Sequence, residues 1–162
     1  MLKKILLWTL FGGMMAYPIE GLWRIPSNGG WVSIFMLPVY GLCFFLIGNI
    51  NQIPAFYRMS MRLQTLIGAA IVLFVELLSG IILNLWLGLN IWDYSSLPAN
   101  VLGQISLLFG VLWLLLIPFA VWLEDKLNWI WEKAHGREAE YNYTLLQAYK
   151  ELFRIGKEAK KL

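Results

Sequence analysis

Four long apolar stretches dominate this chain, and each is close to the length that a helix needs to cross a membrane. The hydrocarbon core of a bilayer is about 30 Å thick, so a spanning helix uses roughly 20 residues. Charged residues make up only 14% of the sequence, whereas a soluble domain carries about 25%. We therefore expect an all-α integral membrane protein with four transmembrane helices in one domain, 1–123. The expected spans are residues 5–22, 31–50, 66–89 and 101–123.

Basic residues predict how these helices are oriented. Lys3 and Lys4 precede the first stretch, and Arg58 and Arg62 lie between the second and third. Apart from Arg24, all the other lysines and arginines follow the fourth stretch. Because cytoplasmic loops carry the excess of lysine and arginine, both termini should be cytoplasmic.

The composition changes after Leu123, and residues 124–162 carry many charges of both signs. We expect a charged cytoplasmic tail with an amphipathic helix that lies on the inner leaflet or docks on a partner. The alternative is a solvated helix that simply ends the chain. His135, beside Gly136, is expected in a loop at a helix break. The helical spacing in the tail is carried by Tyr141, Leu145, Tyr149, Leu152 and Gly156.

Polar side chains are concentrated in the third stretch and in the loop that follows it. An ionised carboxylate at the bilayer centre costs about 2.5 to 3.5 kcal/mol on insertion scales, so Glu76 needs a partner or a purpose. Two interpretations of Glu76 remain open: a hydrogen bond between helices, and binding of a cation, proton or substrate amine. We expect one outward-facing polar site formed by Glu76, Asn84, Asp93, Tyr94, Asn100 and Gln104.

Three local expectations accompany this site. Ser96 should cap the fourth helix, and Pro98 suits the first turn of that helix. In that helix Asn100 and Gln104 would lie one turn apart, facing the same way. Separately, the acid-first spacing of Glu20 and Arg24 favours an ion pair near the outer end of the first span.

No catalytic or nucleotide-binding motif occurs in the sequence. The pairs Gly12-Gly13 and Gly29-Gly30 lack the lysine and the serine or threonine of a phosphate-binding loop. The single cysteine, Cys43, excludes an internal disulfide and a thiol metal cluster. We predict no metal or other cofactor, no nucleic-acid binding and no enzymatic activity. An intramembrane enzyme acting on lipid is the weakest of the alternatives.

A distinctive pattern runs from the third stretch into the fourth: Glu76-Leu-Leu-Ser-Gly80, Leu87-Gly88, Trp92-Asp93-Tyr94-Ser95, Pro98, Asn100, Gly103, Ile105, Leu107 and Trp113. The amino-terminal half adds Glu20, Gly30-Trp31 and Pro38-Val39-Tyr40-Gly41. Over roughly residues 5–123 the chain resembles the putative ABC-transporter type IV family of small, chiefly bacterial, polytopic membrane proteins.

The resemblance implies a transport-associated membrane subunit of the bacterial cytoplasmic (inner) membrane. Because the chain has no nucleotide-binding residues, such a subunit needs a separate ATPase, for which the tail is the candidate docking point. It also needs a second copy of itself to form a path. The alternative is a non-transporting scaffold or regulator that binds another membrane protein. In that case the polar residues of the expected site serve folding.

Overall fold

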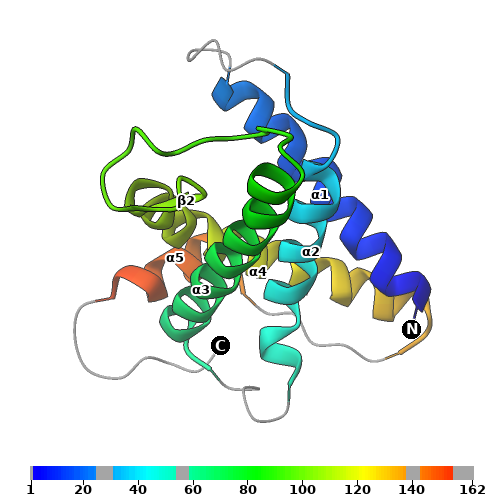
Figure 1. Cartoon of the computed structure of the whole chain (residues 1–162). Helices are drawn as coiled ribbons and strands as arrows, with labels where there is room; N and C mark the ends of the chain where they lie inside the picture. Colours follow the sequence, from blue (N-terminus) through cyan, green and yellow to red (C-terminus); the bar gives the residue numbers. More distant parts are fainter. Residues whose placement is uncertain (1, 25–30, 54–58, 138–142, 155–162) are drawn as a thin grey trace. The chain divides into compact units, whose positions relative to one another are not determined.

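The computed structural model describes residues 2–24, 31–53, 59–137 and 143–154. The prediction of a mostly helical chain is confirmed (Figure 1). The elements in chain order are α1 (Leu2–Arg24), α2 (Met36–Gly48), the 3-10 turn η1 (Ile50–Gln52), α3 (Met61–Gly80), the π-helix η3 (Ile81–Trp86), β1 (Asn100–Val101), β2 (Ile105–Ser106), α4 (Leu107–Ala134) and α5 (Leu145–Phe153).

Three of these helices are long and apolar enough to cross a membrane, whereas the sequence predicted four. They are Lys4–Leu22 in α1, Met61–Trp86 through α3 and η3, and α4. The apolar helix Met36–Gln52, which joins α2 and η1, is shorter. Many large apolar side chains on these helices are exposed, as expected of surfaces that face lipid. The chain therefore has the character of a multi-pass membrane protein.

The second and third predicted spans begin and end at other residues than the observed helices do. Residues 31–35 precede α2 and contain no helix, so the second apolar helix is shorter than expected. α3 begins at Met61, before the predicted start of the third span. At the other end, Leu87 and Leu89 lie beyond η3, and their N–H groups close its last turns by donating to the carbonyls of Ile82 and Leu83.

The expectation of a helix from residue 101 is wrong for residues 101–106, which form a hairpin. β1 and β2 pair antiparallel. The chain reverses between them with positive φ at Leu102 and Gly103, 54° and 68°. The N–H of Gln104 donates to the carbonyl of Val101 at 2.9 Å. Positive φ at both central positions is the requirement of a type I′ turn, which matches the twist of a two-stranded ribbon.

Two further expectations about α4 are corrected by its bounds. Ser96 and Pro98 lie in turns of the loop, and neither caps nor begins the helix, which starts at Leu107. The predicted boundary at Leu123 falls inside α4, which continues to Ala134. The first part of the expected tail is therefore a continuation of the fourth helix.

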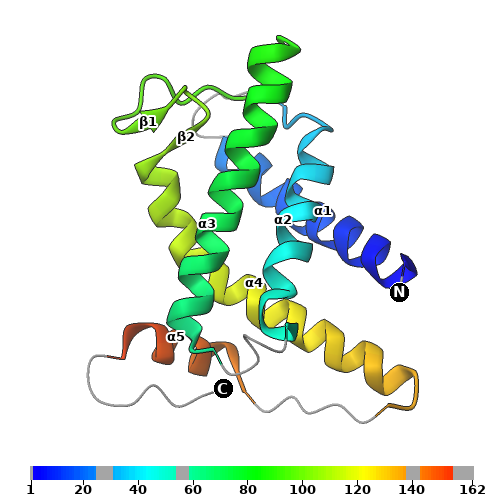
Figure 2. The same ribbon diagram turned by 60° about the horizontal axis from the view of Figure 1, so that its bottom comes forward.

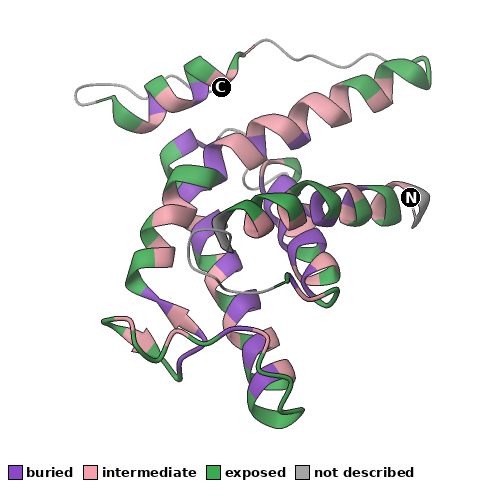
Figure 3. Cartoon of the chain, turned by 90° about the horizontal axis from the view of Figure 1, so that it is seen from above, coloured by how far each residue is buried: buried purple, intermediate pink, exposed green. Residues whose placement is uncertain are grey.

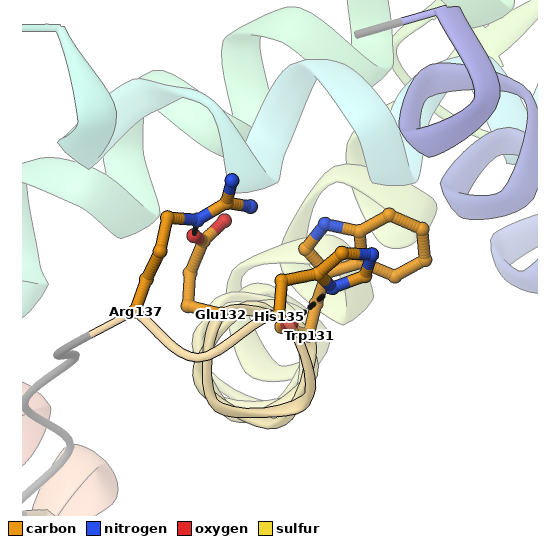
Figure 4. Close-up of polar contacts among 4 residues, drawn as sticks. All are labelled: Trp131, Glu132, His135 and Arg137. Atoms are coloured by element: carbon orange, nitrogen blue, oxygen red, sulfur yellow. Dashed lines mark hydrogen bonds and ion pairs between the residues drawn. The ribbon is translucent and has the colours of Figure 1, made fainter.

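The helix break predicted at His135 and Gly136 is confirmed. Gly136 has a φ of 70°, the left-handed conformation that commonly follows a helix. His135 lies in this turn, where its Nδ1 is 2.8 Å from the carbonyl oxygen of Trp131 and its ring packs against the indole (Figure 4). Beside it, Arg137 pairs with Glu132 of the last helical turns (Figure 4).

The chain divides into two compact units, each made of two segments. The first comprises Met1–Leu46 and Ile71–Gly110, and the second comprises Ile47–Ala70 and Val111–Leu162. α3 and α4 each contribute to both units.

In the first unit, glycines allow α1 and α2 to approach closely. A Cβ atom on Gly13 would lie 2.3 Å from the carbonyl oxygen of Leu37. One on Gly41 would lie 2.1 Å from the carbonyl oxygen of Thr9. Small residues at such contacts let two helix backbones meet, which is the usual way that membrane helices associate.

In the second unit, α3 packs on α4 where Gly68 faces Ile117, since a Cβ on Gly68 would lie 2.7 Å from Ile117 Cγ2. Figure 2 shows that α4 bends along its length. Pro118 lies within this helix and is buried. A proline donates no backbone hydrogen bond and its ring displaces the carbonyl four residues earlier, so it accounts for the bend.

Candidate functional site

A buried carboxylate in α3 is held by a tyrosine of the following loop. Glu76 is only 7% exposed, although the helix around it is apolar. The hydroxyl of Tyr94 donates to Glu76 Oε1 at 3.1 Å. The ring of Tyr94 stacks on Phe109 of α4 with the ring centroids 4.4 Å apart. The structure thus joins two of the six residues of the predicted site, Glu76 and Tyr94.

A second pair from the predicted site, Asn84 and Gln104, forms the centre of a buried amide network. Asn84 Nδ2 donates to Gln104 Oε1 at 2.8 Å and to the carbonyl of Trp92 at 3.0 Å. Its Oδ1 accepts from the N–H of Ile91 at 2.6 Å. Gln104 Nε2 donates to the carbonyl of Leu102 at 3.0 Å. Each amide nitrogen and each amide oxygen therefore has at least one hydrogen-bond partner within the chain.

This network fastens the loop and hairpin to the π-helix. Trp92 is buried, and its indole N–H donates to the carbonyl of Gln104 at 3.0 Å. π-helical turns often occur at functional sites because they redirect side chains within a helix. Here the π-helix η3 carries Asn84 into contact with both ends of the loop.

The other two predicted residues do not join either pair. Asp93 is exposed and accepts from Ser95, from the hydroxyl at 2.5 Å and from the N–H at 2.8 Å. The Ser95 hydroxyl, and then its N–H, hold the pKa of Asp93 below its ordinary value. Asn100 bonds to the carbonyls of Ser95 and Leu97, at 3.2 and 2.8 Å, and accepts from the N–H of Gly103. Both side chains shape the turns of the loop itself.

Glu20 has a partner that the sequence reasoning missed. The hydroxyl of Tyr40 in α2 donates to Glu20 Oε2 at 2.8 Å. The expected partner, Arg24, has a side chain outside the described part of the chain. Tyr40 also lies close enough to Glu76 and Tyr94 to interact with them electrostatically. The first unit therefore gathers two carboxylates, each bonded to a tyrosine hydroxyl from another segment.

The second unit contains a buried polar cluster that the sequence did not predict. Glu124 is 1% exposed and accepts from Gln52 Nε2 at 3.2 and 3.3 Å. Asn128, one turn later on α4, also donates to Glu124. Asp125 accepts from Asn51 Nδ2 at 2.9 and 3.0 Å. The sequence signals this cluster only through two adjacent amides, Asn51 and Gln52, and two adjacent acids, Glu124 and Asp125. It does not connect the two pairs, because they lie in segments far apart in the chain.

The segment that precedes α5 also contacts Asp125. The hydroxyl of Tyr143 donates to Asp125. Gly48 leaves the room that Glu124 occupies, since a Cβ on Gly48 would lie 2.0 Å from Glu124 Cγ. Among the residues that the structure describes, no group of three or more His, Cys, Asp or Glu side chains is placed to hold a metal ion.

The chemistry of the first unit differs between its two parts. The amides of Asn84 and Gln104 bond to each other and to backbone groups of the loop and hairpin. The carboxylates of Glu20 and Glu76 each accept a hydrogen bond from a tyrosine hydroxyl, at 2.8 and 3.1 Å. A carboxylate can take up a proton or meet a cation, so Glu76, bonded to Tyr94, is the buried ionisable group of the predicted site.

Comparison with known proteins identifies a family for this chain. Residues 4–146 match the family described as Putative ABC-transporter type IV. The match extends the resemblance seen over residues 5–123 through the end of α4 to the start of α5. No curated protein and no solved structure matches the chain. The family match covers most of the sequence, and the chain belongs to the putative ABC-transporter type IV family.

Proposed function

We propose that this chain is a transport-associated membrane subunit in which Glu76 and Tyr94 interact with a transported cation, proton or amine. The hydrogen bond between these two residues carries the proposal. It sets a buried carboxylate in an apolar candidate span beside a hydroxyl from the adjoining loop. An acid at such a depth is expensive, and it usually marks an ion or substrate pathway. Family membership supports the transport class.

A separate ATPase would supply the energy for this transport. The chain has no phosphate-binding glycine loop, so we infer that ATP is hydrolysed by another subunit and that a second copy of this chain completes the path. The proposed location is the bacterial cytoplasmic membrane. The chain itself is proposed to have no enzymatic activity, and the purified protein should leave a membrane-lipid extract chemically unchanged.

Both termini are proposed to be cytoplasmic. Contacts in the second unit support this orientation, because Arg62 Nε donates to the carbonyl of Leu152 at 3.1 Å. The start of α3 and the tail helix therefore share one end of the unit, as the distribution of basic residues requires. A membrane-impermeant maleimide tests this in intact cells of a Cys43→Ser background. Ser95→Cys should be labelled and Lys150→Cys should not, and the reverse pattern overturns the orientation.

Purification of the tagged full chain from its native membrane in mild detergent tests the transport role. We expect a stoichiometric ATPase to co-purify, with ATP hydrolysis that depends on this chain. Glu76→Gln should keep the ATPase bound and reduce hydrolysis at least several-fold. Ser79→Ala is the matched control, because among the described residues its hydroxyl bonds to the carbonyls of Val75 and Glu76 on the same helix. Purification without any ATPase contradicts the proposal.

The second candidate function is a membrane scaffold or regulator without transport. The buried network around Asn84 and Gln104 favours it, since amides bonded to each other and to the backbone stabilise a loop without contacting a ligand. In this case Glu76→Gln should lower the thermal stability of the chain equally in all salts and at all pH values. A transport site predicts instead that stability depends on pH or on the cation present, and that Glu76→Gln removes this dependence.

A further inference from the structure

The helix α5 is a preformed element fastened to the second unit. Its first turn has a capping box, in which Thr144 Oγ1 accepts from the N–H of Gln147 at 3.3 Å and Gln147 Oε1 accepts from the N–H of Thr144 at 2.6 Å. Reciprocal bonds of this kind fix where a helix begins. A nine-residue helix is too short to be stable alone, so contacts with the rest of the unit must hold it.

Those contacts lie on one face of α5. Ala148 is completely buried. Glu151 is also buried, and its Oε1 accepts from the N–H of Met61 at 3.4 Å, where it complements the positive end of α3. The hydroxyl of Tyr149 donates to the carbonyl of Leu115 at 2.7 Å, three residues before the proline of the α4 bend. This inner face anchors α5 to α3 and α4.

The opposite face of α5 is apolar and basic. Leu146 is 63% exposed and Phe153 is 61% exposed. They are seven residues apart, which places them on the same side of a helix two turns apart. Lys150 lies between them and is exposed, and Arg154 follows the helix and is also exposed. Figure 3 shows both buried and exposed residues along α5. The acid within α5, Glu151, is on the inner face.

We propose that this outer face, formed by Leu146, Lys150, Phe153 and Arg154, binds a bilayer surface that contains anionic phosphate headgroups. Two apolar side chains can enter the headgroup layer, while the two cations beside them attract lipid phosphates. The proposal concerns lipid recognition and holds whether or not the chain transports a substrate.

The second half of α4 supports this assignment. Lys126 lies 5.1 Å from the ring centroid of Trp122, and Lys133 lies 4.5 Å from that of Trp129. Tryptophan is enriched in the headgroup layer, because its ring is apolar and its N–H is polar. The helix that immediately precedes α5 in the chain thus carries the residue types of a membrane–water interface.

Fluorescence of the reconstituted full chain tests the proposal. In a Cys43→Ser background, Leu146→Cys carries an environment-sensitive nitrobenzoxadiazole label. The protein is placed in vesicles of phosphatidylcholine alone or with one quarter phosphatidylglycerol, each with and without spin-labelled lipid as quencher. With phosphatidylglycerol we expect a blue-shifted label that the spin-labelled lipid quenches. The double substitution Lys150→Glu/Arg154→Glu should reduce the fraction of labels in contact with lipid by roughly an order of magnitude or more. High salt should have the same effect.

The charge-conserving variant Lys150→Arg/Arg154→Lys is the matched control and should behave like the parent protein. Circular dichroism and thermal unfolding of each variant establish that α5 and the rest of the chain remain folded. Equal quenching in the two vesicle types overturns the proposal, because it shows no recognition of anionic headgroups. A label that stays in water in both vesicle types also overturns it, and leaves the outer face of α5 to a protein partner.

Discussion

The side chain of Gln104 occupies the space beside Gly80 that any larger residue would need. A Cβ atom on Gly80 would lie 2.5 Å from Gln104 Oε1 and 2.8 Å from Gln104 Cβ. The same Oε1 accepts the hydrogen bond from Asn84 at 2.8 Å. Glycine at the end of α3 therefore allows the hairpin to reach the π-helix and form the buried amide network.

Replacing Gly80 should detach the hairpin from this network. Gly80→Val is expected to displace Gln104 and to destabilise the chain by about 1–3 kcal/mol, through overpacking and a broken buried hydrogen bond. Thermal unfolding in detergent, followed by circular dichroism, measures the change. Gly110→Ala is the control, because its Cβ would lie an ordinary 3.6 Å from Leu73 Cδ1. Equal stability of the two variants would show that Gln104 does not need this space.

The bond between Asn84 and Gln104 predicts energetic coupling between the two residues. In a double-mutant cycle, Asn84→Ala and Gln104→Ala should show a coupling energy of about 0.5–3 kcal/mol, because either substitution leaves the other amide without its partner. Reversible chemical unfolding in detergent provides the four free energies. The reference pair Ser79→Ala and Asn100→Ala shares no hydrogen bond in the described structure and should be additive within about 0.5 kcal/mol. Additivity in the first pair would contradict the network.

The helices could be predicted because an apolar run of sufficient length has few alternatives in a membrane. The first predicted span, 5–22, falls within α1. The hairpin could not be predicted in this way, since Val101, Leu102 and Ile105 look like a continuation of the fourth apolar run. What sets them apart is the positive φ at Leu102 and Gly103 and the burial of Gln104, which depend on tertiary contacts.

For the candidate site, the sequence could indicate only which residues share a helix face and which lie in the polar loop. Helical spacing placed Glu76 and Asn84 on one face, and the structure gives each a partner from the predicted group. Asp93 belongs to the polar segment between the third and fourth apolar stretches, and its exposed carboxylate accepts from Ser95 within the loop. By its charge, Glu124 falls in the expected charged cytoplasmic tail, 124–162, because charge normally marks the end of a span. Its burial depends on Gln52, which composition alone could not connect to it.

The hydrogen bonds to Asp93 predict a pH effect at acid pH. Because they lower its pKa in the folded chain, the stability that they contribute is complete above about pH 3.9, the ordinary value for aspartate. It is lost as the pH falls through the lowered pKa of the folded state. Ser95→Ala removes the hydroxyl bond, so the pKa of Asp93 should rise toward its ordinary value. Carbon-13 NMR titration of the Asp93 carboxyl measures it. Ser96→Ala should leave the titration unchanged, and an unchanged pKa in Ser95→Ala would refute the assignment.

The contact between Gly41 and Thr9 predicts that α1 and α2 cannot tolerate a larger residue there. In Gly41→Val the new Cβ would meet the Thr9 carbonyl oxygen at 2.1 Å, and a backbone atom in a helix cannot move aside as a flexible side chain can. The two helices must separate, and we expect a loss of about 1–3 kcal/mol or more of stability together with aggregation in detergent. Size-exclusion chromatography and thermal unfolding report both effects. Gly21→Ala is the matched control in α1, since its Cβ would lie 3.7 Å from Val32 Cγ2, an ordinary contact. If Gly41→Val remained as stable and monodisperse as Gly21→Ala, the close approach of α1 and α2 at Thr9 would have to be abandoned.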